Sequence, residues 1–116
     1  MTKESKEKCK KYSDIFRPFL DRFDYECCDA GKYGWTLIYG KNGKVEGQHY
    51  FQSEEELLNQ LNDYWIFHKV MELIDQGKVS DNIVGNNRAL TWLDKIPEEY
   101  AKPLREELDR LNGQVR

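Results

Sequence analysis

The segment that most constrains the fold is a long apolar-rich stretch, residues 53–77, whose two ends both carry helix-boundary signals. Ser53 is a favoured N-cap, and Glu56 three residues later completes a capping box. Gly77 can take the left-handed conformation that ends many helices. Apolar residues occupy one face in the first half and most of the circumference in the second half. A helix that is apolar nearly all round must be covered from several sides, so we expect residues 53–77 to form a long central helix.

Length and charge indicate one globular domain with an uneven charge distribution. The chain has 116 residues, 39% hydrophobic and 13% aromatic, which suits a single domain, 1–116. The net charge is −3, yet residues 1–11 carry five Lys and two Glu, so the remainder is acidic. We expect this charged N-terminus, 1–11, to be frayed. The acidic remainder disfavours nucleic acid as a partner and fits a basic protein instead.

Cysteine usage and hydropathy suggest a cytoplasmic protein. The three cysteines, Cys9, Cys27 and Cys28, are odd in number and two are adjacent, which does not suit a disulfide framework. No apolar run approaches the roughly 20 residues of a membrane span, and the first residues lack the apolar core of a secretion signal. These features predict a reducing, cytosolic environment and no membrane contact.

Residues 23–52 are predicted to form three short strands. Lys41-Asn42-Gly43-Lys44 is a strong type I′ hairpin signal and should pair residues 33–40 with residues 44–52. A weaker turn at residues 29–32 should join residues 23–28 to residues 33–40. The two turns together predict a three-stranded antiparallel meander.

Helices are expected on both sides of this meander. The first would run from about residue 6 to residue 23 with a kink at Pro18, or it would begin near residues 16–17 with Pro18 in its first turn. After a polar loop at residues 78–87, another helix would start at Asn86 or Asn87, and the last would carry Pro103 in its first turn. The predicted fold class is therefore α+β, a three-stranded antiparallel meander with flanking helices in the order α-β-β-β-α-α-α and one long central helix.

The beginning of this order, α-β-β-β-α, resembles the topology of double-stranded RNA-binding domains. Those domains place lysines at the start of the second helix, where they meet phosphates. In this chain the corresponding residues are Ser53, Glu54, Glu55 and Glu56, which would repel phosphate. The resemblance therefore implies a topology and not RNA binding.

Two-residue loops predict a strand register in which Ile38 faces Gly47 and Thr36 faces His49. One sheet face would then be apolar and uncharged, and it should meet the helix of residues 53–77. The other face would combine aromatic side chains with carboxylates and amides, which is typical of protein interfaces. Its candidate partner-binding residues are Asp24, Glu26, Tyr33, Trp35, Tyr39, Glu46, Gln48 and Tyr50. In the alternative arrangement, the first or the last helix covers this face and makes it part of the core.

No residue pattern predicts a catalytic, cofactor or metal site. Cys27 and Cys28 are consecutive in a predicted strand, so their side chains should point to opposite faces. Cys9, His49 and His68 lack the spacing of zinc ligands. A Gly-rich phosphate loop is also missing from the sequence. We therefore predict a protein that is not an enzyme and needs no cofactor.

These features lead to the hypothesis of a small cytosolic protein-binding module. An acidic domain with an aromatic and carboxylate face suits the blocking of a basic groove, as immunity proteins and phage or mobile-element anti-defence inhibitors of nucleases do. The alternative is a nucleic-acid-binding accessory protein that uses the basic N-terminus. The same aromatic face could also close a homodimer by symmetric burial.

Overall fold

A computed structural model describes residues 3–19, 26–29, 34–41, 44–85 and 88–115. The chain divides into two compact units, Met1–Leu61 with Val115 and Asn62–Gln114 with Arg116. Within the described ranges no helix combines the length and hydrophobicity needed to cross a membrane.

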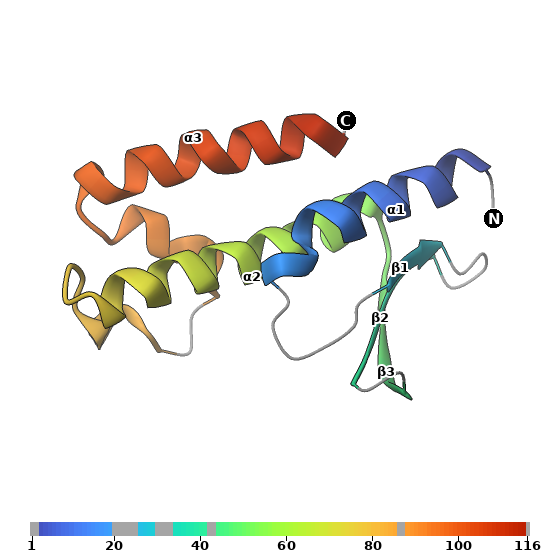
Figure 1. Ribbon diagram of the computed structural model, residues 1–116, viewed down its shortest axis with the longest axis horizontal. Helices are drawn as coiled ribbons and strands as arrows, with labels where there is room; N and C mark the ends of the chain where they lie inside the picture. The colour runs from blue at the N-terminus through green and yellow to red at the C-terminus, as the bar shows by residue number, and fades with distance from the viewer. Residues whose placement is uncertain (1–2, 20–25, 30–33, 42–43, 86–87, 116) are drawn as a thin grey trace. The chain divides into compact units, whose positions relative to one another are not determined.

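The elements of the first unit (Figure 1) are α1 (Lys3–Phe16), the 3₁₀ helix η1 (Arg17–Phe19), β1 (Glu26–Asp29), β2 (Trp35–Lys41), β3 (Lys44–Phe51) and the start of α2 (Glu54–Asp75). The second unit contains the remainder of α2, two further 3₁₀ helices and α3. These are η3 (Asp81–Ile83), η4 (Ala89–Asp94) and α3 (Glu98–Val115).

Helix α1 begins at Lys3, so the basic segment that we expected to be frayed is helical. Its buried residues recur at helical spacing and form one stripe. They are Cys9, Tyr12, Ser13 and Phe16. The helix ends at Phe16 instead of residue 23, because Pro18 lacks an N–H and disfavours the helical conformation at Arg17. Residues 20–23 of the expected helix lie outside the described ranges.

Glu54 joins the first turn of α2 to α1. The Tyr12 hydroxyl donates a hydrogen bond to the Glu54 carboxylate, and Lys8 Nζ lies 3.2 Å from Glu54 Oε1. Tyr12 is only 1% exposed, so this hydrogen bond satisfies a phenol that the core has removed from water. The contact therefore fixes α1 against the start of α2 within the first unit.

The sheet has the strand order β1-β2-β3 with antiparallel pairs. Its main part is the β2–β3 hairpin, to which β1 adds four residues. Helix α1 packs against β1, and the Tyr12 ring meets the Trp35 ring at 6.5 Å with an interplanar angle of 62°. Among the described residues α1 therefore makes the extensive contact with the sheet that the sequence led us to expect from residues 53–77. The hairpin residues Asn42 and Gly43 lie outside the described ranges.

The predicted fold class, with its order α-β-β-β-α-α-α, is wrong. The segment expected to form the third α-helix is the six-residue 3₁₀ helix η4, and the helices α1, α2 and α3 of 14, 22 and 18 residues dominate the described structure. The sheet is a small addition that rests mainly on one antiparallel hairpin. The α+β character remains, but helices rather than a meander determine the architecture.

Helix α2 has both boundaries that its sequence predicted. The Glu56 N–H donates to Ser53 Oγ at 3.1 Å, as in a capping box, and the Glu56 carboxylate accepts at 2.9 Å from the N–H of Gln52, the residue before the N-cap. Gly77 has a φ of 72°. The N–H groups of Gly77 and Lys78 donate to the carbonyls of Ile74 and Leu73, so the C-terminus is closed by a Schellman motif.

In the second unit, η4 packs through a three-residue period. Ala89 and Trp92 are both buried and stand one 3₁₀ turn apart. The N–H of Leu90 donates to Asp63 Oδ1 of α2 at 3.0 Å, which satisfies the start of the short helix. Pro97 disfavours a continuous helix from η4 into α3, so η4 remains a short 3₁₀ helix of six residues. The expected N-caps Asn86 and Asn87 lie outside the described ranges.

Helix α3 is continuous from Glu98, so Pro103 lies inside the helix and not in its first turn. Arg105 joins this helix to η4, because its guanidinium donates to the Leu93 carbonyl and Asp94 of η4 as well as to Glu98, at 2.7–2.8 Å. The hydrogen bond to Glu98, followed by that to Asp94, raises the pKa of Arg105 above its ordinary value. Buried Ala101 and Leu108 hold the same helix in the core of the unit.

Replacing Ser53 with Ala should lower the free energy of unfolding by about 1 kcal/mol, because the N–H of Glu56 loses its acceptor. Urea denaturation followed by circular dichroism would measure the loss. Ser53→Asp is the matched control and should retain most of the stability, since aspartate also caps a helix. An equal loss in both variants would contradict a capping role for the hydroxyl.

Candidate functional site

The candidate partner-binding residues are only partly covered by the described structure. Asp24 and Tyr33 lie outside the described ranges, and the Glu26 backbone is in β1 while its side chain lies outside them. The other five are placed on the hairpin. Trp35 and Tyr39 belong to β2, and Glu46, Gln48 and Tyr50 belong to β3.

A β-bulge changes the register of the hairpin. Gly40 pairs with Val45 as predicted, but Tyr39 then pairs with Gly47. Glu46 is therefore the extra residue of β3 at an irregularity between Tyr39 and Gly40. Because side chains alternate along a strand, this shift by one residue moves the following residues of β3 to the other face relative to β2.

The register between β1 and β2 also differs from the prediction. Cys27 pairs with Leu37, whereas a two-residue turn would have paired it with Gly34. The chain between Asp29 and Trp35 is longer than a two-residue turn, which accounts for the difference. The observed partner lies three residues from the predicted one. Because three is an odd number, the positions of β1 fall on the opposite face from the one predicted, as do those of β3 beyond the bulge.

The predicted aromatic and acidic face is therefore divided between the two sides of the sheet. Gln48 and Tyr50 lie opposite Ile38 and Thr36, on the side that also takes the Glu26 position. Trp35 and Tyr39 occupy the other side, where their neighbours are Leu37, His49 and Phe51. The expectation that all eight residues share one face is wrong.

The side that carries Trp35 is partly core. Trp35 contacts the ring of Tyr12 from α1, and Leu37 beside it is 1% exposed. The Tyr39 phenol lies over Gly47, where it occupies the position that a Cβ atom would take. For Trp35 the structure thus agrees with the alternative in which the first helix covers the aromatic residues.

Strand β3 is the exposed part of the candidate site. Val45 is 66% exposed and Tyr50 is 50% exposed, so this strand presents apolar surface to solvent. The Tyr50 hydroxyl donates to Gln48 Oε1 at 2.8 Å, so these two side chains are held together on the surface. In the described ranges β3 pairs with β2 on one edge only. A partner could therefore reach both its side chains and its backbone.

Acidic residues continue this surface directly after β3. Glu54 is engaged by Lys8 and Tyr12, and Glu56 takes part in the capping box. Glu55 and Glu56 are both exposed in the first turn of α2, and Glu46 is exposed in β3. The arrangement offers an apolar and aromatic strand with carboxylates near both of its ends.

Metal and thiol chemistry receive no support from the described residues. No group of three or more His, Cys, Asp or Glu among them is arranged to hold a metal ion. Cys9 is in no disulfide bond, and it is buried in the first unit.

Sequence reasoning missed the exposure of Val45 and His49, which were assigned to the buried face. An isolated glycine inside a strand often marks a bulge. Gly47, next to Glu46, was the signal that could have revealed the change of register. A groove between the last turns of α2 and the first turns of α3 had no sequence signal of comparable strength, because its residues come from two helices distant in sequence.

Comparisons of the chain with protein-family models, with curated proteins and with solved structures find no match. The candidate site therefore rests on the geometry of the described residues, above all on β3.

Replacing Gly47 with Ala should destabilise the protein by about 1–3 kcal/mol, because the new methyl group would overlap the Tyr39 phenol. A double-mutant cycle with Tyr39→Ala, measured by urea denaturation, should give a coupling energy above about 0.5 kcal/mol. The matched cycle with Tyr50→Ala should be additive, since Tyr50 lies on the other face. Coupling to Tyr50 and not to Tyr39 would contradict the observed register.

Proposed function

We propose that this protein is a small, non-enzymatic module that binds another protein through β3, and that it acts as an inhibitor or immunity-type protein against a partner with a basic surface. The exposure of β3 is the observation that carries the proposal. Val45 is 66% exposed and Tyr50 is 50% exposed, so both present apolar surface that a bound partner would remove from water. Burial of such surface is worth about 25 cal/mol per Å².

Tyr50 is the proposed anchor. Tyrosine is enriched among the residues that dominate interface energies, and truncation of such a residue typically costs about 2 kcal/mol or more. Its hydroxyl is already held by Gln48, so little rotamer freedom remains to be lost when a partner binds. This preorganisation supports a binding role for the Gln48–Tyr50 pair.

Charge supports a basic partner. Glu46, Glu55 and Glu56 are exposed on β3 and the adjoining turn of α2, and the whole chain carries a net charge of −3. Carboxylates around an apolar contact accelerate association with a cationic surface and discriminate against acidic proteins. We place the protein in the cytoplasm, where a cysteine outside any disulfide bond, such as Cys9, stays reduced.

Affinity capture from the native host tests the proposal. Tyr50→Ser bait should recover the partner at least about 10-fold less efficiently than wild-type bait, as expected for a loss of about 1.4 kcal/mol or more. Val84→Ser is the control, because Val84 is also an exposed large hydrophobic residue, at 42%, but belongs to the second unit. Quantitative mass spectrometry would measure recovery, and circular dichroism would verify that both variants fold.

Equal recovery by wild-type and Tyr50→Ser bait would contradict the proposal. A variant that changes only self-association, seen by analytical ultracentrifugation, would assign β3 to a homodimer instead of an inhibitory complex.

A nucleic-acid-binding role remains a second proposal because α1 is an ordered basic helix. Lys3, Lys6, Lys10 and Lys11 are all exposed on it. Lys8 is less suited to this role, since Glu54 lies 3.2 Å away and already neutralises it.

The triple variant Lys6→Gln/Lys10→Gln/Lys11→Gln tests the second proposal. If α1 contacts phosphates, binding of a 20-base-pair duplex should weaken steeply with salt, and the triple variant should reduce the magnitude of the salt slope by about 3. Fluorescence anisotropy would measure both. Lys78→Gln is the single-site control in the second unit. Absence of salt-dependent binding by the wild-type protein would eliminate this role.

A further inference from the structure

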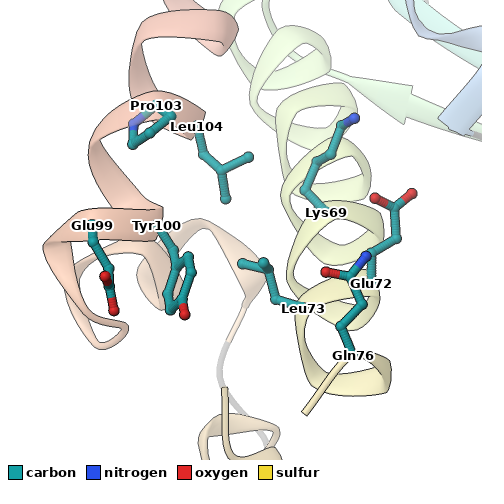
Figure 2. A pocket seen from close by; sticks show the side chains of 8 residues that line it. All are labelled: Lys69, Glu72, Leu73, Gln76, Glu99, Tyr100, Pro103 and Leu104. Atoms are coloured by element: carbon teal, nitrogen blue, oxygen red, sulfur yellow. The ribbon is translucent and has the colours of Figure 1, made fainter. Parts of the chain in front are cut away.

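A groove in the second unit lies between the last turns of α2 and the first turns of α3 (Figure 2). Its volume is about 280 Å³. The lining residues are Lys69, Glu72, Leu73, Gln76, Glu99, Tyr100, Pro103 and Leu104. All eight belong to one compact unit, so the groove is a property of that unit alone.

The floor of the groove is apolar. Leu73 projects from α2 towards α3, and Leu104 projects from α3 towards α2 (Figure 2). Tyr100 lies beside them, and all three are only half-buried. The two helices thus leave a strip of apolar surface open to solvent between them.

The rim of the groove carries one carboxylate from each helix. Glu72 of α2 and Glu99 of α3 are both exposed, and neither forms an ion pair with the described residues. The cation of Lys69 lies 5.6 Å from the centroid of the Trp65 ring, so the ring already engages this charge. Figure 2 shows the two carboxylates on opposite sides of the groove, so a cationic ligand would meet one of them at the rim.

The volume of the groove and the chemistry of its lining residues both favour one kind of ligand. Pockets for small molecules and cofactors usually measure roughly 300–1,000 Å³, so this groove suits one long side chain better than a cofactor. Arginine matches it best. Its aliphatic stem covers apolar surface while the guanidinium stays at the edge. The planar guanidinium also stacks on an aromatic ring and forms paired hydrogen bonds with carboxylates.

We infer that this groove receives an arginine side chain from the basic partner protein. Its stem would lie on Leu73 and Leu104, and its guanidinium would reach Tyr100 and one of the two rim carboxylates, Glu99 or Glu72. The inference rests on the proposed function, because that function supplies a partner with a basic surface. It adds a second contact that is chemically distinct from the exposed strand β3.

Titration of the full-length, ¹⁵N-labelled protein with a blocked Gly-Arg-Gly peptide tests the inference. Amide shifts should concentrate at Leu73, Tyr100 and Leu104, and an otherwise identical peptide with neutral citrulline should bind at least about threefold more weakly, because a charged hydrogen bond is lost. The double variant Glu72→Gln/Glu99→Gln should weaken binding of the arginine peptide by about two- to threefold, as expected for the loss of one carboxylate contact.

Glu106→Gln is the matched control, since Glu106 is also an exposed carboxylate of α3 but does not line the groove. Its affinity for the arginine peptide should equal that of the wild-type protein. Equal binding of the arginine and citrulline peptides, or an equal loss in Glu106→Gln and the double variant, would overturn the inference.

Capture of the native partner separates the failure of this inference from the failure of the proposed function. Tyr50→Ser should lose the partner and keep the arginine-peptide shifts, because the strand and the groove belong to different units. If the peptide shifts are absent while Tyr50→Ser still loses the partner, the groove inference fails and the proposed function stands. If Tyr50→Ser recovers the partner as well as the wild-type bait does, the proposed function fails with the inference that rests on it.

Discussion

The first unit depends on one polar contact between segments that are distant in sequence. Tyr12 is almost completely buried, and its hydroxyl finds an acceptor in Glu54, 42 residues further along the chain. An unpaired phenol in that position would cost about 1–3 kcal/mol. The carboxylate therefore constrains where α1 can lie, and α1 in turn covers Trp35 and the base of the hairpin. With α1 in this position, the outer strand β3 is left as the exposed side of the sheet.

The sequence predicts local helix boundaries well and long-range strand pairing poorly. The caps of α2 could be predicted because Ser53, Glu56 and Gly77 act on residues within one turn. The sheet register could not, because one extra residue at Glu46 exchanges the faces of a whole strand. The prediction that Pro103 lies in the first turn of the last helix was wrong for a related reason. The local preference of Pro103 is outweighed by burial elsewhere in α3 and by the contacts of Arg105.

The register determines how much of the candidate site could be predicted. Residue types were informative, since Tyr50, Gln48 and Glu46 are exposed. The sequence did not reveal which of the candidate residues share a face, because Trp35 and Tyr39 lie on the opposite side of the sheet from Gln48 and Tyr50. The acidic groove of the second unit has a comparable origin. Glu72 and Glu99 come to line one groove only when α2 and α3 pack, and their spacing in the sequence does not predict that packing.

The bulge at Glu46 also bears on how an open strand edge behaves at high protein concentration. A long, flat, apolar edge would template the stacking of further chains into ordered aggregates. A bulge interrupts the regular ladder and increases the local twist, and the charged side chains of Lys44 and Glu46 on the same strand would lose hydration if an identical copy stacked on it. The feature that breaks the symmetry of the sheet can thus keep β3 open to a shaped partner while it disfavours polymerisation.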